Sequence, residues 1–200
     1  MMFLYAQFSF ARAYTGDEKH ELTENHNTMA LFVIYGNMNS GKTHTCWLIY
    51  ALLKNAGKRL AYDTVPQQPD WTFSEVLQHI TNMSVAPATT PLASDFRALF
   101  AYKGKKIAIF SAGDFLHDPN WEVTSFDDNM AWALQNNVDH VICCSRSLNR
   151  TGSVQRYILD NFRISIYRWY WKKQTNVVQD QIEDAQRVAI ELFKDIESDC

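Results

Sequence analysis

The segment A-L-F-V-I-Y-G-N-M-N-S-G-K-T, residues 30–43, decides the fold. Residues 30–35 form a short apolar run with β-branched and aromatic side chains, as expected of a strand that is buried on both faces. A polar, glycine-containing turn follows, and the next apolar stretch, residues 43–55, predicts a helix that ends near Gly57. This order of strand, turn and helix predicts the first unit of a parallel α/β sheet.

The rest of the chain continues the alternation of strands and helices. Further strands are predicted over residues 58–63, 106–110, 138–144 and 163–171, and further helices over residues 73–83, 93–102, 127–136 and 154–161. Together they predict a single three-layer α/β/α domain over residues 29–176, with a mainly parallel sheet of about five strands. A proline-rich excursion over residues 64–91 is a candidate substrate or partner loop.

Two segments flank this domain. Residues 1–28 are expected to lie outside the core as a polar leader, because residues 14–28 carry no periodic apolar pattern. Residues 177–200 predict an amphipathic helix whose apolar stripe consists of Val178, Ile182, Ala185, Ala189, Leu192 and Ile196. The stripe either packs against the sheet or mediates contact with a protein partner or a second copy of the chain.

The composition argues against several classes of function. A net charge of −3 and a pI of about 6.0 do not suit a protein that coats nucleic acid or an anionic membrane, so a nucleic-acid partner is unsupported by the charge. The cysteines lack zinc-finger or C-x-x-C spacing, which favours reduced thiols. No apolar run approaches the roughly 20 residues that span a bilayer. We therefore expect a cytoplasmic protein with no membrane partner.

The turn at residues 36–43 matches the phosphate-binding pattern G-x-x-x-x-G-K-[ST]. Glycines permit the dihedral angles that wrap backbone N–H groups around phosphate oxygens, and the following helix directs its positive end at the same anion. Lys42 is expected to neutralise phosphate charge, and Thr43 to offer its hydroxyl to Mg²⁺. We therefore predict that ATP and Mg²⁺ bind at Gly36, Asn37, Met38, Asn39, Ser40, Gly41, Lys42, Thr43 and His44. The alternative is a glycine-rich turn that binds no ligand.

A carboxylate beside a neighbouring strand is expected to complete the Mg²⁺ shell. Ser111 and Ala112 stand where an acidic pair would follow the strand at residues 106–110, and Asp114 is the nearest carboxylate. We predict Asp114 as a metal ligand and catalytic group, with a turn or helix-capping aspartate as the alternative. Asp63, at the end of the strand over residues 58–63, is the other carboxylate placed to meet the phosphates or a bound substrate, with a plain loop aspartate as the alternative.

Arginines follow the strand at residues 138–144. Because ligands bind at the carboxyl edge of an open α/β sheet, Arg146 and Arg150 are predicted to contact the transferring phosphate, with solvated loop arginines as the alternative. Residues 167–173 interleave aromatic and basic side chains. This pattern favours an edge strand over a platform that stacks single-stranded nucleic acid.

The stretch I-Y-G-N-M-N-S-G-K-T resembles the P-loop NTPase superfamily, and its Met38 and Ser40 are similar to the loop of thymidine kinases. The chain departs from thymidine kinases in lacking a D-E-x-Q-F element and paired C-x-x-C motifs, so their substrate is not inferred. The stretch M-A-W-A-L-Q-N-N-V-D-H-V-I-C-C-S-R-S resembles the helix and strand that precede the polar sensor residue in RecA-like and DNA-packaging ATPases.

These resemblances imply NTP hydrolysis or phosphoryl transfer, by an NTPase or a nucleotide-kinase-like phosphotransferase. Two alternatives stay open. One is a nucleotide-sensing regulatory protein with weak or no hydrolysis, which the missing acidic pair favours. The other is a DNA-linked motor or packaging-type ATPase.

Overall fold

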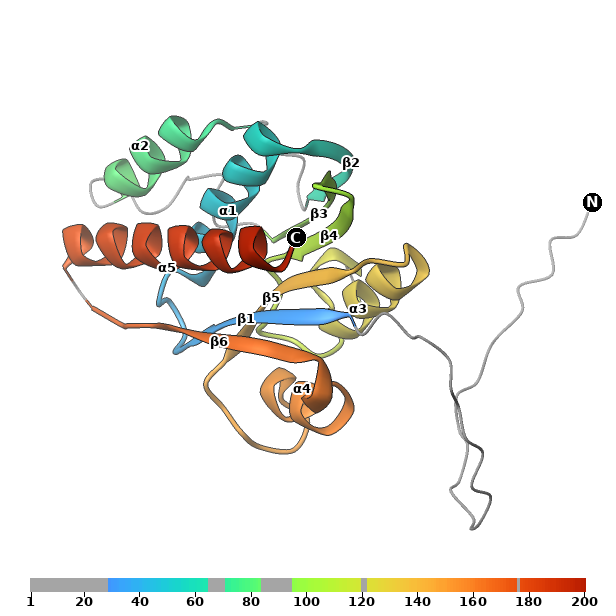
Figure 1. Cartoon of the computed structure of the whole chain (residues 1–200). Coiled ribbons are helices and arrows are strands. Elements are labelled where there is room, and N and C mark those ends of the chain that lie inside the picture. The colour runs from blue at the N-terminus through green and yellow to red at the C-terminus, as the bar shows by residue number, and fades with distance from the viewer. Residues whose placement is uncertain (1–28, 65–70, 84–94, 120–121, 176) are drawn as a thin grey trace, which may run out of the picture.

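The computed structural model describes residues 29–64, 71–83, 95–119, 122–175 and 177–200 (Figure 1). The predicted leader lies outside these residues, as do two parts of the proline-rich excursion. The strands are β1 (Ala30–Gly36), β2 (Lys58–Thr64), β3 (Phe96–Tyr102), β4 (Lys105–Phe110), β5 (His140–Arg146) and β6 (Ile166–Lys172). The helices are α1 (Lys42–Ala56), α2 (Phe73–Met83), α3 (Phe126–Gln135), α4 (Val154–Asn161) and α5 (Val178–Asp199), with 3₁₀ turns at Glu122–Thr124 and Arg163–Ser165.

The six strands form one sheet in the order β2-β3-β4-β5-β1-β6. All neighbours pair in parallel except β3, which is antiparallel to both β2 and β4. The α/β class and the mainly parallel sheet are therefore confirmed, with one strand more than the sequence predicted.

The additional strand corrects the helix expected over residues 93–102. Lys103 and Gly104 both have positive φ angles, 46° and 81°, which make a tight two-residue turn of the kind that joins antiparallel strands. Most of β3 is buried, including Phe96 and Phe100, because it lies inside the sheet with layers on both faces. Apart from Arg97, the strand is apolar, so it lacks the regular alternation that would separate it from a buried helix.

Helices cover both faces of the sheet, which gives the three-layer arrangement (Figure 1). α1, α2 and α5 pack over one face, in a core cluster with Phe32, Phe96 and Ile109. α3 and α4 contribute to the cluster on the other face, around Val33 and Phe110.

α1 lies at the centre of its layer. It packs against both α2 and α5, and its residues 45–51 are all buried. The apolar stripe of α5 packs in the same layer, with Ile182, Ala185, Ala189, Leu192 and Ile196 buried within the chain. That stripe is therefore part of the domain core and not a face left for a partner.

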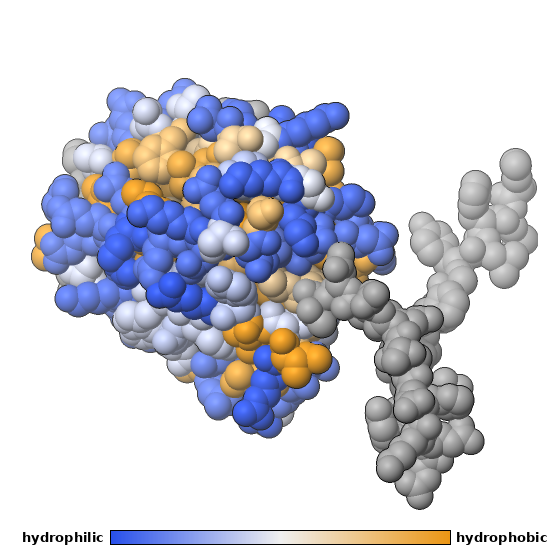
Figure 2. Space-filling view, in the orientation of Figure 1, coloured by the Kyte–Doolittle hydropathy of each residue, from blue (hydrophilic) through white to orange (hydrophobic). Residues whose placement is uncertain are grey.

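The outer surface of this layer is mixed in polarity. Figure 2 shows hydrophilic side chains along much of the view and apolar ones in two areas, between α2 and α5 and near the connection from α4 to β6. Ile164, in that connection, is 92% exposed. Within the described ranges, no helix combines the length and the apolar character needed to cross a membrane.

Candidate functional site

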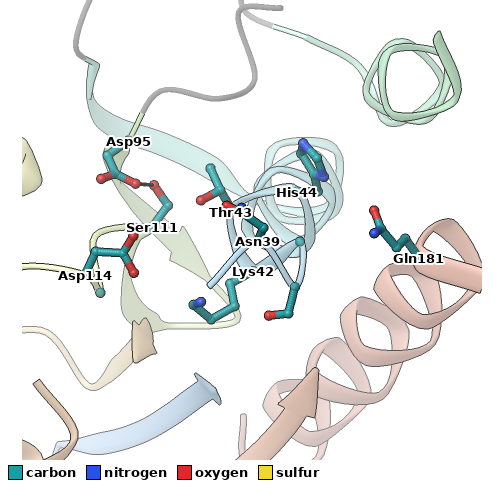
Figure 3. A pocket seen from close by; sticks show the side chains of 11 residues that line it. Asn39, Lys42, Thr43, His44, Asp95, Ser111, Asp114 and Gln181 are labelled. Carbon is teal, nitrogen blue, oxygen red and sulfur yellow. Dashed lines mark hydrogen bonds between the residues drawn. The ribbon is translucent and has the colours of Figure 1, made fainter. Parts of the chain in front are cut away.

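A pocket of about 430 Å³ lies at the carboxyl edge of the parallel strands, around the start of α1. Its lining comes from the turn after β1, the ends of β3 and β4 that meet at this edge, and the first turn of α5: Asn39, Ser40, Gly41, Lys42, Thr43, His44, Asp95, Ser111, Gly113, Asp114 and Gln181. Figure 3 shows Lys42 and Thr43 between Asp95, Ser111 and Asp114 on one side and His44 and Gln181 on the other. The structure thus brings Lys42, Thr43 and Asp114, three residues predicted for the site, to one pocket.

The loop between β1 and α1 needs each of its glycines for a different reason. Gly41 has a φ of 80°, in the left-handed region, and precedes the first residue of α1. Gly36 instead needs space, because a Cβ there would lie 2.7 Å from both the Lys172 carbonyl oxygen and the Ser40 Oγ. Only Gly41 therefore fits the expectation that both glycines serve unusual dihedral angles.

The amino end of α1 is electropositive and open. Its cap residue is Gly41, which has no side chain that could bond the first N–H groups, and the first turn holds no acidic residue. The first N–H groups of a helix lack partners within it, so they favour an anion at this end. The buried Lys42 adds a full positive charge here, and its Nζ donates to the carbonyl oxygens of Gly36 at 3.3 Å and Asn37 at 3.0 Å.

Asn37 braces the loop against two neighbouring loops. Its Oδ1 accepts from the Ser147 hydroxyl at 2.6 Å, and its Nδ2 donates to Gln174 Oε1 at 3.1 Å. These contacts follow β5 and β6, the strands on either side of β1. Asn37 therefore has a structural role behind the pocket. Met38 is 55% exposed to solvent.

Asp114 and Arg146 form a bidentate ion pair at the pocket wall. Arg146 Nε lies 2.6 Å from one carboxylate oxygen and Nη2 lies 2.9 Å from the other. Gly113 allows this approach, because a Cβ at that position would lie 2.5 Å from the Cys144 carbonyl carbon and oxygen. The chain after β4 thus crosses the end of β5. This crossing places Asp114 beside Arg146. The sequence predicted both residues for the site but not their pairing.

Asp95 is a pocket carboxylate that the sequence reasoning missed. It precedes β3 and accepts a 2.7 Å hydrogen bond from the Ser111 hydroxyl. Desolvation by burial raises the pKa of Asp95 to about 6, with Ser111 and Lys42 acting in the opposite direction and Asp114 adding to the rise. The incorrect helix over residues 93–102 hid this residue. The K-G turn at residues 103–104 was the sequence signal that could have revealed it.

The opposite side of the pocket contains an imidazole that is held neutral. Burial, together with the nearby charge of Lys172, lowers the pKa of His44 to about 4. Lys172 is itself fully buried behind the loop, and its Nζ lies 2.7 Å from Asp184 of α5. Asp184 also pairs with Arg187 at 2.7 Å within α5. The Lys172–Asp184 pair thus ties α5 to the end of β6, next to the loop between β1 and α1.

Two other candidates lie away from this pocket. Arg150 lines a separate surface depression with Arg156 and Tyr157, so the structure does not bring it to the first pocket. Asp63 pairs with Arg97 at 3.4 Å and does not line the first pocket either.

Comparisons with known proteins bring no relative to this site. No family model, curated protein or solved structure matches the chain. The chemistry of the site therefore has to be argued from its own residues: an open helix amino end, a buried lysine, and hydroxyl and carboxylate oxygens on one wall.

Proposed function

We propose that this protein binds a Mg²⁺–nucleoside triphosphate, with ATP as the nucleotide, and acts on its phosphate bonds. The observation that carries the proposal is the convergence of Lys42, Thr43 and the amino end of α1 on a single pocket. Positive charge and directed N–H groups bind phosphate oxygens, and both are provided here by the motif.

The oxygen atoms that line the pocket fit Mg²⁺, which prefers oxygen ligands. The hydroxyls of Thr43 and Ser111 and the carboxylates of Asp95 and Asp114 all line the pocket. When bound, Mg²⁺ supplies neutralisation of the phosphate charge. Lys42 would exchange its bonds to the loop carbonyls for phosphate oxygens, and Arg146 is one ion pair away from the same anion.

A second function, nucleotide sensing without efficient turnover, is favoured by a specific feature of the site. Ser111 and Ala112 occupy the end of β4, and no glutamate is among the described residues that line the pocket. Arg146, the cation beside the pocket, is engaged by Asp114. A site of this kind binds a triphosphate but lacks a second carboxylate at β4 to orient a water molecule.

Nucleotide binding is tested by calorimetric titration of ATP into wild-type protein and the Lys42→Ala variant. We expect Lys42→Ala to weaken binding at least tenfold. Lys103→Ala, a lysine in the exposed turn at the other end of β3, is the matched control and should bind as wild type. Equal affinity in wild type and Lys42→Ala would refute the proposal.

The reaction is resolved by phosphate release with and without nucleoside acceptors or DNA. Turnover of ATP alone supports hydrolysis, and turnover only with a nucleoside supports kinase-type transfer. Stimulation by DNA supports a motor-type ATPase. ATP binding without turnover under all these conditions supports the sensing function.

A further inference from the structure

We infer that Asp95, held by Ser111, is the carboxylate that binds the Mg²⁺ of the nucleotide complex, directly or through its water shell. The inference rests on the proposed function and assigns the metal to a different residue from the one that the sequence predicts. It moves the acidic group from the end of β4 to the start of the antiparallel neighbour β3.

Ser111 fixes the polarity of this arrangement. Its Oγ lies 3.1 Å from the Phe96 N–H, which can only donate, so the hydroxyl must accept there. The single hydroxyl proton is then directed to Asp95, at 2.7 Å. Ser111 therefore holds one oxygen of Asp95 as a hydrogen-bond acceptor.

α1 places Thr43 next to this pair. Trp47 lies one helical turn after Thr43, so both side chains project from the same face of α1. The Trp47 ring packs on Phe96 with centroids 4.2 Å apart, and Phe96 is the residue after Asp95. The contact sets Thr43 level with Asp95, and Figure 3 shows the Thr43 hydroxyl directed toward the Asp95–Ser111 pair.

Asp114 is a weaker candidate for the same role because Arg146 engages both of its oxygens. Bidentate arginine–carboxylate pairs are among the stronger charged hydrogen bonds, so a metal at Asp114 would have to compete with the guanidinium. Asp95 has one oxygen on Ser111, and no described residue bonds the other.

The experiment is titration of ATP in excess Mg²⁺ and in EDTA, with the ratio of the two affinities as the readout. Wild type should bind ATP at least tenfold more tightly with Mg²⁺. Asp95→Asn should reduce that ratio to below about twofold while binding ATP in EDTA at least as well as wild type, because a negative charge near the phosphates is removed. Circular dichroism and thermal unfolding establish that the variant is folded.

Two comparisons make the result decisive. Asp63→Asn, a carboxylate outside the pocket, should keep the wild-type ratio. Loss of the ratio in Asp114→Asn, with the ratio retained in Asp95→Asn, would overturn the inference and leave nucleotide binding intact. Absence of ATP binding by wild type in both conditions would overturn the proposed function, and this inference with it.

Discussion

Asp95→Asn should stabilise the nucleotide-free protein at neutral pH, although it removes a charged hydrogen bond. The pKa of Asp95 rises from 3.8 to about 6 on folding, first because burial desolvates the carboxylate. A difference of about 2 pKa units corresponds to roughly 3 kcal/mol against the ionised native state. Because the side chain is only partly buried, and because asparagine bonds Ser111 less strongly, we expect a net gain of about 0.5–2 kcal/mol.

The pH dependence of the stability difference between Asp95→Asn and wild type tests this explanation. A carboxyl group with a raised native pKa favours folding below its unfolded value of 3.8, and this contribution is lost as the pH rises through about 6. The advantage of Asp95→Asn should therefore be complete above pH 7 and absent near pH 4.

The assay is urea unfolding at pH 4.5 and 7.5 without Mg²⁺, followed by tryptophan fluorescence, since Trp47 lies against Phe96. Added Mg²⁺–ATP should then stabilise wild type more than the variant, because ligand that binds only the native state raises its stability. Destabilisation of Asp95→Asn at pH 7.5, or a difference that does not change with pH, would refute the reasoning.

Three other predictions concern the support of the site. Gly113→Ala should destabilise the protein by about 1–3 kcal/mol in urea unfolding, because its Cβ would lie 2.5 Å from the Cys144 carbonyl group; wild-type stability would contradict this. Lys172→Met should lower the free energy of unfolding by about 2–4 kcal/mol, because it leaves Asp184 without its buried partner, and addition of Asp184→Asn should recover part of the loss, which a double-mutant cycle measures. His44→Gln should make the protein less sensitive to acid. Burial lowers the native pKa of His44 to about 4, so the wild type loses stability as the pH falls from 6.5 through 4. If the free energies of unfolding of wild type and variant differ by the same amount at pH 7 and pH 4, this prediction is wrong.

The local pattern of the sequence predicted most of the fold. The helix over residues 154–161 agrees with α4 at both ends, and the helix over residues 73–83 agrees with α2. These segments have one apolar face or clear boundary residues, so their periodicity is unambiguous. β3 was missed because both of its faces are buried in the three-layer core, where the distinction between strand and helix periodicity disappears.

The sequence placed single residues at the site, but it did not predict the contacts between segments that are distant in sequence. Lys42 and Thr43 follow from the motif, because the loop and the start of α1 are formed by consecutive residues. The pairing of Asp114 with Arg146 depends on the strand order, which places β4 beside β5, and no local pattern contains that order. Arg150 was expected in the pocket because it is near Arg146 in sequence, but the loop carries it to another depression.

The strand order also explains why two aspartates line one pocket. β5 lies between β1 and β4, so the end of β4 is about 10 Å from the end of β1 at ordinary strand spacing. The chain crosses that gap at Gly113, and Asp114 then meets Arg146, the last residue of β5. The charge of Asp114 is therefore neutralised by Arg146 of β5, the strand that the chain crosses.

A cation at the Thr43 side therefore needs a second carboxylate from a different direction. An antiparallel strand is the arrangement that brings the residue before a strand, and not the one after it, to the carboxyl edge of a parallel sheet. β3 is the antiparallel strand of this sheet, and Asp95 is the residue before it. In this fold Asp114 pairs with Arg146, and the proposed metal is therefore assigned to Asp95. The two substitutions should differ in effect: we expect Asp114→Asn to free the arginine, and Asp95→Asn to remove the proposed cation site.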